Sequence, residues 1–162
     1  MIRSPIRLGL AVLLLSACSA TGPGARDDEA EAQRLVALQD FLATLDDGQR
    51  QRALSPFDAP ARLDWHFVPR ERPGVLLGEL DLRQRTALHA LMGTTLSTQG
   101  HLKVDGIIRL EDVLFELQSQ PGAPASHRDP GLYAFQAFGT PGHGPWAWRF
   151  EGHHVALNST ST

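Results

Sequence analysis

The sequence predicts an α+β fold in which N-terminal helices are followed by a small antiparallel sheet built around a tryptophan-rich hairpin. Two patterns support this class. From residue 29 to residue 118, apolar residues recur at spacings of three and four, as in amphipathic helices, with one extended interruption. From residue 132 onward, apolar residues alternate with small or polar ones, as in strands. The length of 162 residues fits one domain preceded by a leader.

Residues 1–17 have the pattern of a bacterial lipoprotein signal peptide. Arg3 and Arg7 provide a positive start, and the apolar run 8–15 is far shorter than the roughly 20 residues that span a bilayer. The segment Leu15-Ser16-Ala17-Cys18 resembles a lipobox, which implies that Cys18 is lipidated and becomes the mature N-terminus. The alternative is an ordinary secretory signal peptide in which the cysteine has no role.

A lipidated Cys18 places the chain in the cell envelope, with its N-terminal lipid in a membrane. Ser19 stands where inner-membrane retention typically uses Asp, which favours the outer membrane in a Gram-negative cell. Residues 18–28 are small and polar with glycine and proline, as expected of a flexible tether. Residues 29–162 then form a single α+β domain.

The helical part is predicted to contain four helices. The first starts at Glu29, and the second starts at Asp46, where Gln49 completes a capping box. The segment 80–85 repeats the same helix start before a third helix over residues 81–96. The inward residues of a fourth helix over 102–118 are Val104, Ile107, Ile108, Leu114 and Leu117. Between the second and third helices, residues 63–68 are predicted to be a strand or an extended arm, and residues 119–128 a loop.

The sheet is predicted from three segments. Residues 132–138 and 146–150 alternate, and a two-residue turn at Glu151-Gly152 leads to a return strand over 153–158. In that register one face carries Trp146, Trp148, Phe150, His153, Val155 and Leu157. The other face carries Arg149, His154 and Asn158.

Composition excludes several classes of function. Cys18 is the only cysteine, so the chain has neither an intrachain disulfide nor a zinc site built from several thiolates. A formal charge of −3 argues against a nucleic-acid partner, because such proteins usually carry a basic patch. The sequence contains no glycine-rich phosphate loop, no nucleophile elbow and no zinc-protease helix motif. It identifies no cofactor, and a protein or small-molecule partner is not specified.

The hairpin carries the densest set of metal-ligating side chains. The candidate ligands of a divalent transition metal are His143, Glu151, His153 and His154, since imidazole and carboxylate suit such ions. Adjacent strand residues point to opposite faces, so His153 and His154 share one ion only if the strand bulges. The alternative is structural: His153 packs among the tryptophans and His154 lies across from Arg149.

The extended segment before the third helix is a candidate ligand-binding site. Arg70 and Arg72 flank it with the spacing of a fork that suits a carboxylate, sulfate or phosphate. The candidate binding residues are Trp65, His66, Arg70, Arg72 and Arg149. The alternative is a solvated loop whose charges have no ligand.

Several separated motifs, in order, resemble the bacterial domain-of-unknown-function family numbered 3500. They are residues 41–50, Trp65–Arg70, Leu110–Leu114, Arg128–Tyr133, Phe138–Pro141 and Trp146–His154. The resemblance covers about residues 38–158. It implies an exported protein without an assigned activity, in a family whose members are roughly twice as long. The chain is therefore expected to be a C-terminally truncated member that corresponds to the N-terminal part of the family fold.

Together these features predict a cell-envelope lipoprotein that serves as a binding or accessory module. The alternative from another class is a metal-dependent hydrolase-like enzyme that uses the region of His153 and His154, with Glu151 as the carboxylate. The first function requires no metal, whereas the second requires one.

Overall fold

The computed structural model describes residues 23–66, 68, 70–123 and 125–162. The helices are α1 (Pro23–Thr44), α2 (Asp47–Ala53), α3 (Leu82–Gly93) and α4 (Thr98–Gln118). The strands are β1 (Leu54–Ser55), β2 (Val75–Leu76), β3 (Ala134–Thr140), β4 (His143–Glu151) and β5 (Ala156–Ser161). Short 3-10 turns lie at η1 (Pro60–Arg62), η2 (Leu77–Glu79), η3 (Ser126–Arg128) and η4 (Pro130–Leu132). The predicted α+β class, with helices first and a sheet after them, is confirmed.

The sheet is mixed rather than wholly antiparallel. Strands β3, β4 and β5 form an antiparallel meander, and β2 also pairs with β3 in an antiparallel orientation. The short β1 pairs with β3 in parallel, with Leu54 opposite Ala137. This pairing arises because β1 leaves the end of α2 directly, and the Gln136 side chain donates to the Ser55 hydroxyl at 2.8 Å.

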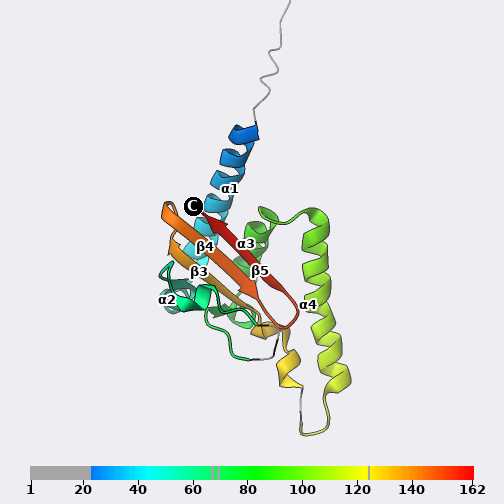
Figure 1. Cartoon of the computed structure of the whole chain (residues 1–162). Helices are drawn as coiled ribbons and strands as arrows, with labels where there is room; N and C mark the ends of the chain where they lie inside the picture. Colours follow the sequence, from blue (N-terminus) through cyan, green and yellow to red (C-terminus); the bar gives the residue numbers. More distant parts are fainter. Residues whose placement is uncertain (1–22, 67, 69, 124) are drawn as a thin grey trace, which may run out of the picture.

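One face of the sheet is apolar and is covered by α1 and α3 (Figure 1). Trp146, Trp148 and Phe150 lie on this face of β4, and all three are buried. Phe41 of α1 packs edge-on against Phe135 of β3, with ring centroids 4.8 Å apart. Leu38, Phe41, Leu88 and Leu91 complete the core from the two helices. The alternation seen in the sequence therefore encodes this core.

The opposite face of the sheet is polar yet also buried, because residues 56–72, here called the arm, fold across it. Gln136, Arg149 and Glu151 lie on this face, and each is less than 5 % exposed. Arg149 donates to the carbonyl oxygens of Ala61 and Asp64 at 2.7 and 3.2 Å. The predicted strand or arm at 63–68 is thus an irregular covering segment, since no strand is assigned to its described residues.

The two similar helix starts noted in the sequence are paired in space. Asp46 and Asp81 cap α2 and α3, and in each box the glutamine three residues later, Gln49 or Gln84, returns a bond to the cap residue. The two glutamine side chains also donate to each other, at 3.4 and 2.7 Å. A reciprocal amide pair therefore joins the starts of the two helices.

Helix α4 ends at Gln118 as predicted, but its start and the burial of Leu117 differ from the prediction. It begins at Thr98 rather than at residue 102, because Ser97 caps it by accepting from the Gly100 amide. Leu117, expected to face inward, is 74 % exposed, since the C-terminal half of α4 extends past the sheet (Figure 1). Val104 is buried as predicted, and Glu111 is buried two turns further along the same helix.

The connection between β4 and β5 also departs from the prediction. A four-residue turn, 152–155, is closed by the Gly152 amide donating to the Val155 carbonyl at 2.8 Å. Strand β5 consequently begins at Ala156, and neither His153 nor His154 belongs to a strand. Beyond the turn, the predicted faces are nevertheless kept. Leu157 lies opposite Phe150 on one face of the sheet, and Asn158 lies opposite Arg149 on the other.

At the N-terminal end, α1 begins at Pro23, within the segment predicted to be a tether, rather than at Glu29. This stretch contains alanine and arginine, which have high helix propensity, and proline is well tolerated at a first helical position. Cys18 and the signal segment lie outside the described residues. Among the described helices, none combines the length and apolar composition needed to cross a bilayer.

Candidate functional site

A cavity of about 440 Å³ lies where the arm, α4, the two short turns η3 and η4, and the β4–β5 turn meet. Its walls are mostly polar or titratable. The lining residues are Arg70, Glu71, Arg72, Glu111, Ser126, His127, Asp129, Leu132, Tyr133 and His153. The cavity therefore combines members of both candidate sets from the sequence, which lie far apart along the chain.

Glu111 is the most unusual group in the cavity wall. Its side chain is 2 % exposed, although it sits on a helix whose neighbouring positions are largely open to solvent. The Oε1 atom accepts no hydrogen bond, whereas Oε2 accepts one from Arg128 Nη1 at 3.4 Å. A buried carboxylate is costly unless it is paired, so this position requires nearby positive charge or donors.

His153 and His154 both turn toward Glu111, which corrects the prediction that adjacent residues point to opposite faces. The two rings stack with centroids 4.3 Å apart. The Nδ1 atom of His153 lies 3.5 Å from Glu111 Oε1, and Nε2 of His154 lies 3.9 Å from the same oxygen. The strand rule fails here because the four-residue turn releases both residues from the pleat.

Arg128 of η3 lies at the centre of this group. Its Nη1 atom is 3.0 Å from His153 Nδ1, 3.1 Å from His154 Nε2 and 3.4 Å from Glu111 Oε2. A guanidinium group only donates, so the two ring nitrogens act as acceptors where they are bonded to Arg128. The Arg128 Nε atom donates to Gln118 at 3.1 Å, which holds the side chain against α4.

The electrostatics of the cavity follow from its burial. Desolvation, together with the nearby His154 and Arg128, lowers the pKa of His153 below its usual value of 6.5, against an opposing effect of Glu111. Burial likewise raises the pKa of the Tyr133 phenol above 10.0. Neutral His153 and neutral Tyr133 are therefore the favoured forms at pH 7.

The carboxylate and the third histidine predicted for a metal site do not join this group. Glu151 faces the arm on the polar side of the sheet, where its Oε1 lies 3.3 Å from Arg149 and 3.8 Å from Arg72. His143 is exposed at the opposite end of β4, eight residues and roughly 26 Å of strand from Glu151. The predicted combination of His143 and Glu151 with His153 and His154 is therefore wrong, because strand geometry separates them.

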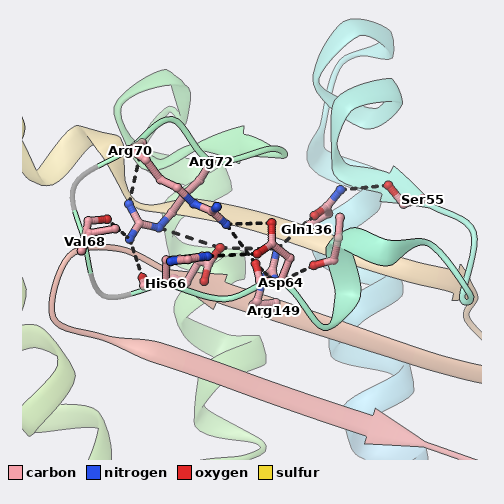
Figure 2. Close-up of polar contacts among 10 residues, drawn as sticks. Ser55, Asp64, His66, Val68, Arg70, Arg72, Gln136 and Arg149 are labelled. Carbon is pink, nitrogen blue, oxygen red and sulfur yellow. Dashed lines mark hydrogen bonds and ion pairs between the residues drawn. The ribbon is translucent and has the colours of Figure 1, made fainter.

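The two arginines of the arm have different environments and do not form a fork. Arg72 is 3 % exposed, and its Nη2 donates to the carbonyl oxygens of His66 and Val68 at 2.8 and 3.3 Å (Figure 2). Arg70 is 32 % exposed and pairs with Asp64 at 2.9 Å. This pairing lowers the pKa of Asp64. Arg72 therefore orders the arm, while Arg70 stands at its surface.

The remaining candidate binding residues are divided between the surface and the interior. Trp65 is 56 % exposed, and His66 is half exposed beside Asp64, 3.2 Å away. Arg149 is buried beneath the arm, where Figure 2 shows it pointing to the arm backbone and to Gln136. Burial lowers the pKa of the Arg149 guanidinium from its ordinary value. Arg149 is thus a structural support and makes no part of the cavity wall.

Sequence reasoning missed Glu111, Arg128 and His127. Glu111 had a visible signal, because it falls between Ile107 or Ile108 and Leu114 at the inward spacing of α4, where a charged residue breaks the apolar face. Arg128 and His127 precede η4 in an irregular segment that has no periodicity. Only the three-dimensional arrangement could bring them to the turn after β4.

A second group of titratable side chains lies on the surface between α3 and α4. The ring nitrogens of His89 and His101 approach to 2.9 Å, and Asp105 Oδ1 lies 3.7 Å from His89. His101 and Asp105 are four residues apart on α4, so they share one face of the helix. Unlike Glu111, these groups are half exposed and do not line the cavity beside the β4–β5 turn.

The fold and the cavity define an α+β domain with a buried polar site at one end of its sheet. The chain belongs to the family described as "Protein of unknown function (DUF3500)", whose sequence profile matches residues 28–162. The resemblance found in the separated motifs is thereby confirmed. No curated protein and no solved structure matches the chain.

Proposed function

We propose that this chain is a lipid-anchored lipoprotein of the cell envelope whose folded part is a binding module. The signal segment ending at Cys18 supports the anchor, and Ser19 favours the outer membrane in a Gram-negative cell. The single observation that supports a binding role is the cavity of about 440 Å³, because its size suits a small ligand and nine of its ten lining residues carry polar or titratable groups.

The anchor is tested by changing Cys18 to Ser and following the chain through membrane fractionation. Loss of the thiol removes the acceptor of the lipid, so the variant should leave the membrane fraction. Ser19→Asp keeps the acceptor and should shift the lipidated chain toward the inner membrane of a Gram-negative host. Tight membrane association of the Cys18→Ser chain would contradict the anchor.

The ligand is proposed to be a small anion that carries a carboxylate, sulfate or phosphate group. Arg70 lines the cavity and is partly exposed. Once it has left Asp64, its guanidinium group can donate two parallel hydrogen bonds to a bound anion. Arg72 is more deeply buried and donates to backbone carbonyl oxygens of the arm. It therefore holds the arm in place at the cavity wall instead of contacting the ligand.

Binding is tested by titrating the purified full chain, in detergent, with inorganic phosphate and with sulfate, monitored by amide NMR shifts. Arg70→Ala should reduce the affinity, whereas Arg83→Ala, which removes an exposed charge from α3 away from the cavity, should leave it unchanged. Equal affinities in the two variants would remove Arg70 from the ligand site.

The second candidate function is a metal-dependent hydrolase-like enzyme. The convergence of Glu111, His153 and His154 favours it, because two imidazoles and a carboxylate can hold a divalent transition metal with an open position. Such an ion would supply Lewis-acid activation of water. Hydrolysis of phosphate or carboxylate esters that depends on added zinc, and that His153→Gln abolishes, is expected. Zinc binding without any hydrolysis would reject this candidate.

A further inference from the structure

Three potential ligand atoms converge at the wall of the cavity. One atom each from Glu111, His153 and His154 lies within 4.8 Å of the other two. Two ligands bound about 2.1 Å from one tetrahedral ion lie about 3.4 Å apart. The separations of 3.5 and 3.9 Å between Glu111 Oε1 and the two ring nitrogens approach this value, and the ligand atoms of the two histidines lie within 4.8 Å of each other.

The carboxylate of Glu111 gives a second and independent indication of a ligand. Its Oε1 atom is buried and accepts no hydrogen bond from the described residues, and it points at the two histidines. A buried anionic oxygen without a donor is costly, and a bound cation is one way to stabilise it. An ion coordinated there would satisfy the oxygen and both imidazoles at once.

The position between these ligand atoms is already occupied by a cation of the chain. Arg128 Nη1 lies 3.0–3.4 Å from the two histidines and from Glu111, and it donates to ring nitrogens that would otherwise bind a metal. Since the guanidinium engages one ring nitrogen of each imidazole at a single point, it brings the ligands together and blocks them at the same time.

We propose that Glu111, His153 and His154 form a binding site for a divalent transition metal ion of the zinc class, which enters by displacing the side chain of Arg128. This inference deepens the second candidate function, because it identifies the carboxylate ligand and the internal competitor. His154 is 51 % exposed, so an ion reaches the site from solvent without a global rearrangement.

The displacement keeps a positive charge beside Glu111 and raises the local charge by one unit. A divalent ion replaces one positive charge beside Glu111, and the released guanidinium can remain bound to Gln118 through its Nε atom. Deleting Arg128 therefore removes a competitor without removing a ligand. Removal of Arg128 should strengthen metal binding, whereas removal of a purely structural ion pair would not.

The test measures zinc affinity by calorimetric titration of the full chain in detergent. All variants carry His89→Gln and His101→Gln, which eliminate the exposed histidine pair between α3 and α4 as a competing site. In this background Arg128→Gln should bind zinc about tenfold more tightly, since the ion no longer displaces charge-assisted hydrogen bonds. Arg109→Gln, which removes an exposed positive charge from α4, should leave the affinity close to the starting value.

Loss of a ligand should act in the opposite direction. Glu111→Gln should weaken zinc binding by about tenfold or more. His154→Gln provides the same test at a half-exposed residue, so it does not depend on tolerance of a buried change. Cobalt(II) gives a second readout, because His154→Gln should alter the visible spectrum of the bound ion in the Arg128→Gln background.

Two results would overturn the inference. One is an Arg128→Gln chain that binds zinc no more tightly than the Arg109→Gln chain, and the other is an affinity that His154→Gln leaves unchanged. Either result leaves the anion-binding proposal standing, because phosphate titration and the Arg70→Ala variant test it separately. Conversely, zinc binding of the expected kind without hydrolysis rejects the enzyme and supports the site.

Discussion

The two faces of the sheet are buried by different means. The face carrying Trp148 is apolar and packs on α1 and α3, whereas the face carrying Arg149 is polar and is covered by the arm. Apolar packing requires only complementary shape, but a buried arginine and glutamate each require specific partners. The comparison indicates that the helix-covered face supplies stability, while the arm-covered face positions the arm beside the cavity.

The largest effect is expected from breaking the polar network. Arg149→Met removes the nearest positive charge from buried Glu151, so the free energy of unfolding should fall by about 3–5 kcal/mol. Urea unfolding followed by circular dichroism measures this change. The double variant Arg149→Met, Glu151→Leu should recover part of the loss, because no unpaired carboxylate remains. Equal losses in the single and double variants would show that the arm-covered face behaves as ordinary packing.

The helix-covered face should respond through cavity formation alone. Leu91 is fully buried in α3, and Leu91→Ala should lower the free energy of unfolding by about 2–5 kcal/mol. No charged group loses a partner here, so the loss depends only on the volume removed. Leu91→Met conserves most of that volume and should therefore be much less destabilising than Leu91→Ala. The same urea measurement checks both variants. A Leu91→Ala change below about 0.5 kcal/mol would place this residue outside the core.

A matched pair within the arm sharpens the contrast between buried and exposed charge. Arg72→Met removes a buried side chain that donates to three arm carbonyl oxygens, and it should lower stability by about 1–3 kcal/mol and increase proteolysis of the arm. Arg70→Met, two residues away, removes an exposed ion pair and should have a much smaller effect. Limited proteolysis distinguishes the two, and equal cleavage rates would contradict the role assigned to Arg72.

The smallest expected effect is a pH dependence from His153. Its pKa is lowered in the folded chain, so the unfolded chain takes up this proton first as the pH falls. The contribution of neutral His153 to stability is therefore fully present above about pH 6.5 and declines as the pH decreases toward the lower folded-state pKa. Urea midpoints from pH 8 to pH 5 should reveal the decline. His153→Gln should reduce its slope, and an unchanged slope would assign the dependence to other groups.

Sequence reasoning recovered the parts of the fold that local patterns encode. The capping boxes at Asp46 and Asp81 are confirmed because three-residue spacing and side-chain chemistry are sufficient to define them. The β4–β5 turn was mispredicted, since Glu151-Gly152 also suits a two-residue turn and only the pairing of Glu151 with Ala156 decides the register. The predicted metal ligands were all taken from this hairpin. The prediction therefore named Glu151 as the carboxylate, whereas Glu111 of α4 lies beside the two histidines in the structure.

The sequence by itself determined the α+β class, the two similar helix starts, the apolar face of β4 and the family to which the chain belongs. These features follow from periodicity, capping chemistry and ordered motifs, all of which act over short stretches. The tertiary structure decided that Arg149 supports the arm and that Arg128 meets Glu111 and the two histidines. Those contacts join segments far apart in the chain, and burial determines which charges must be paired when they meet.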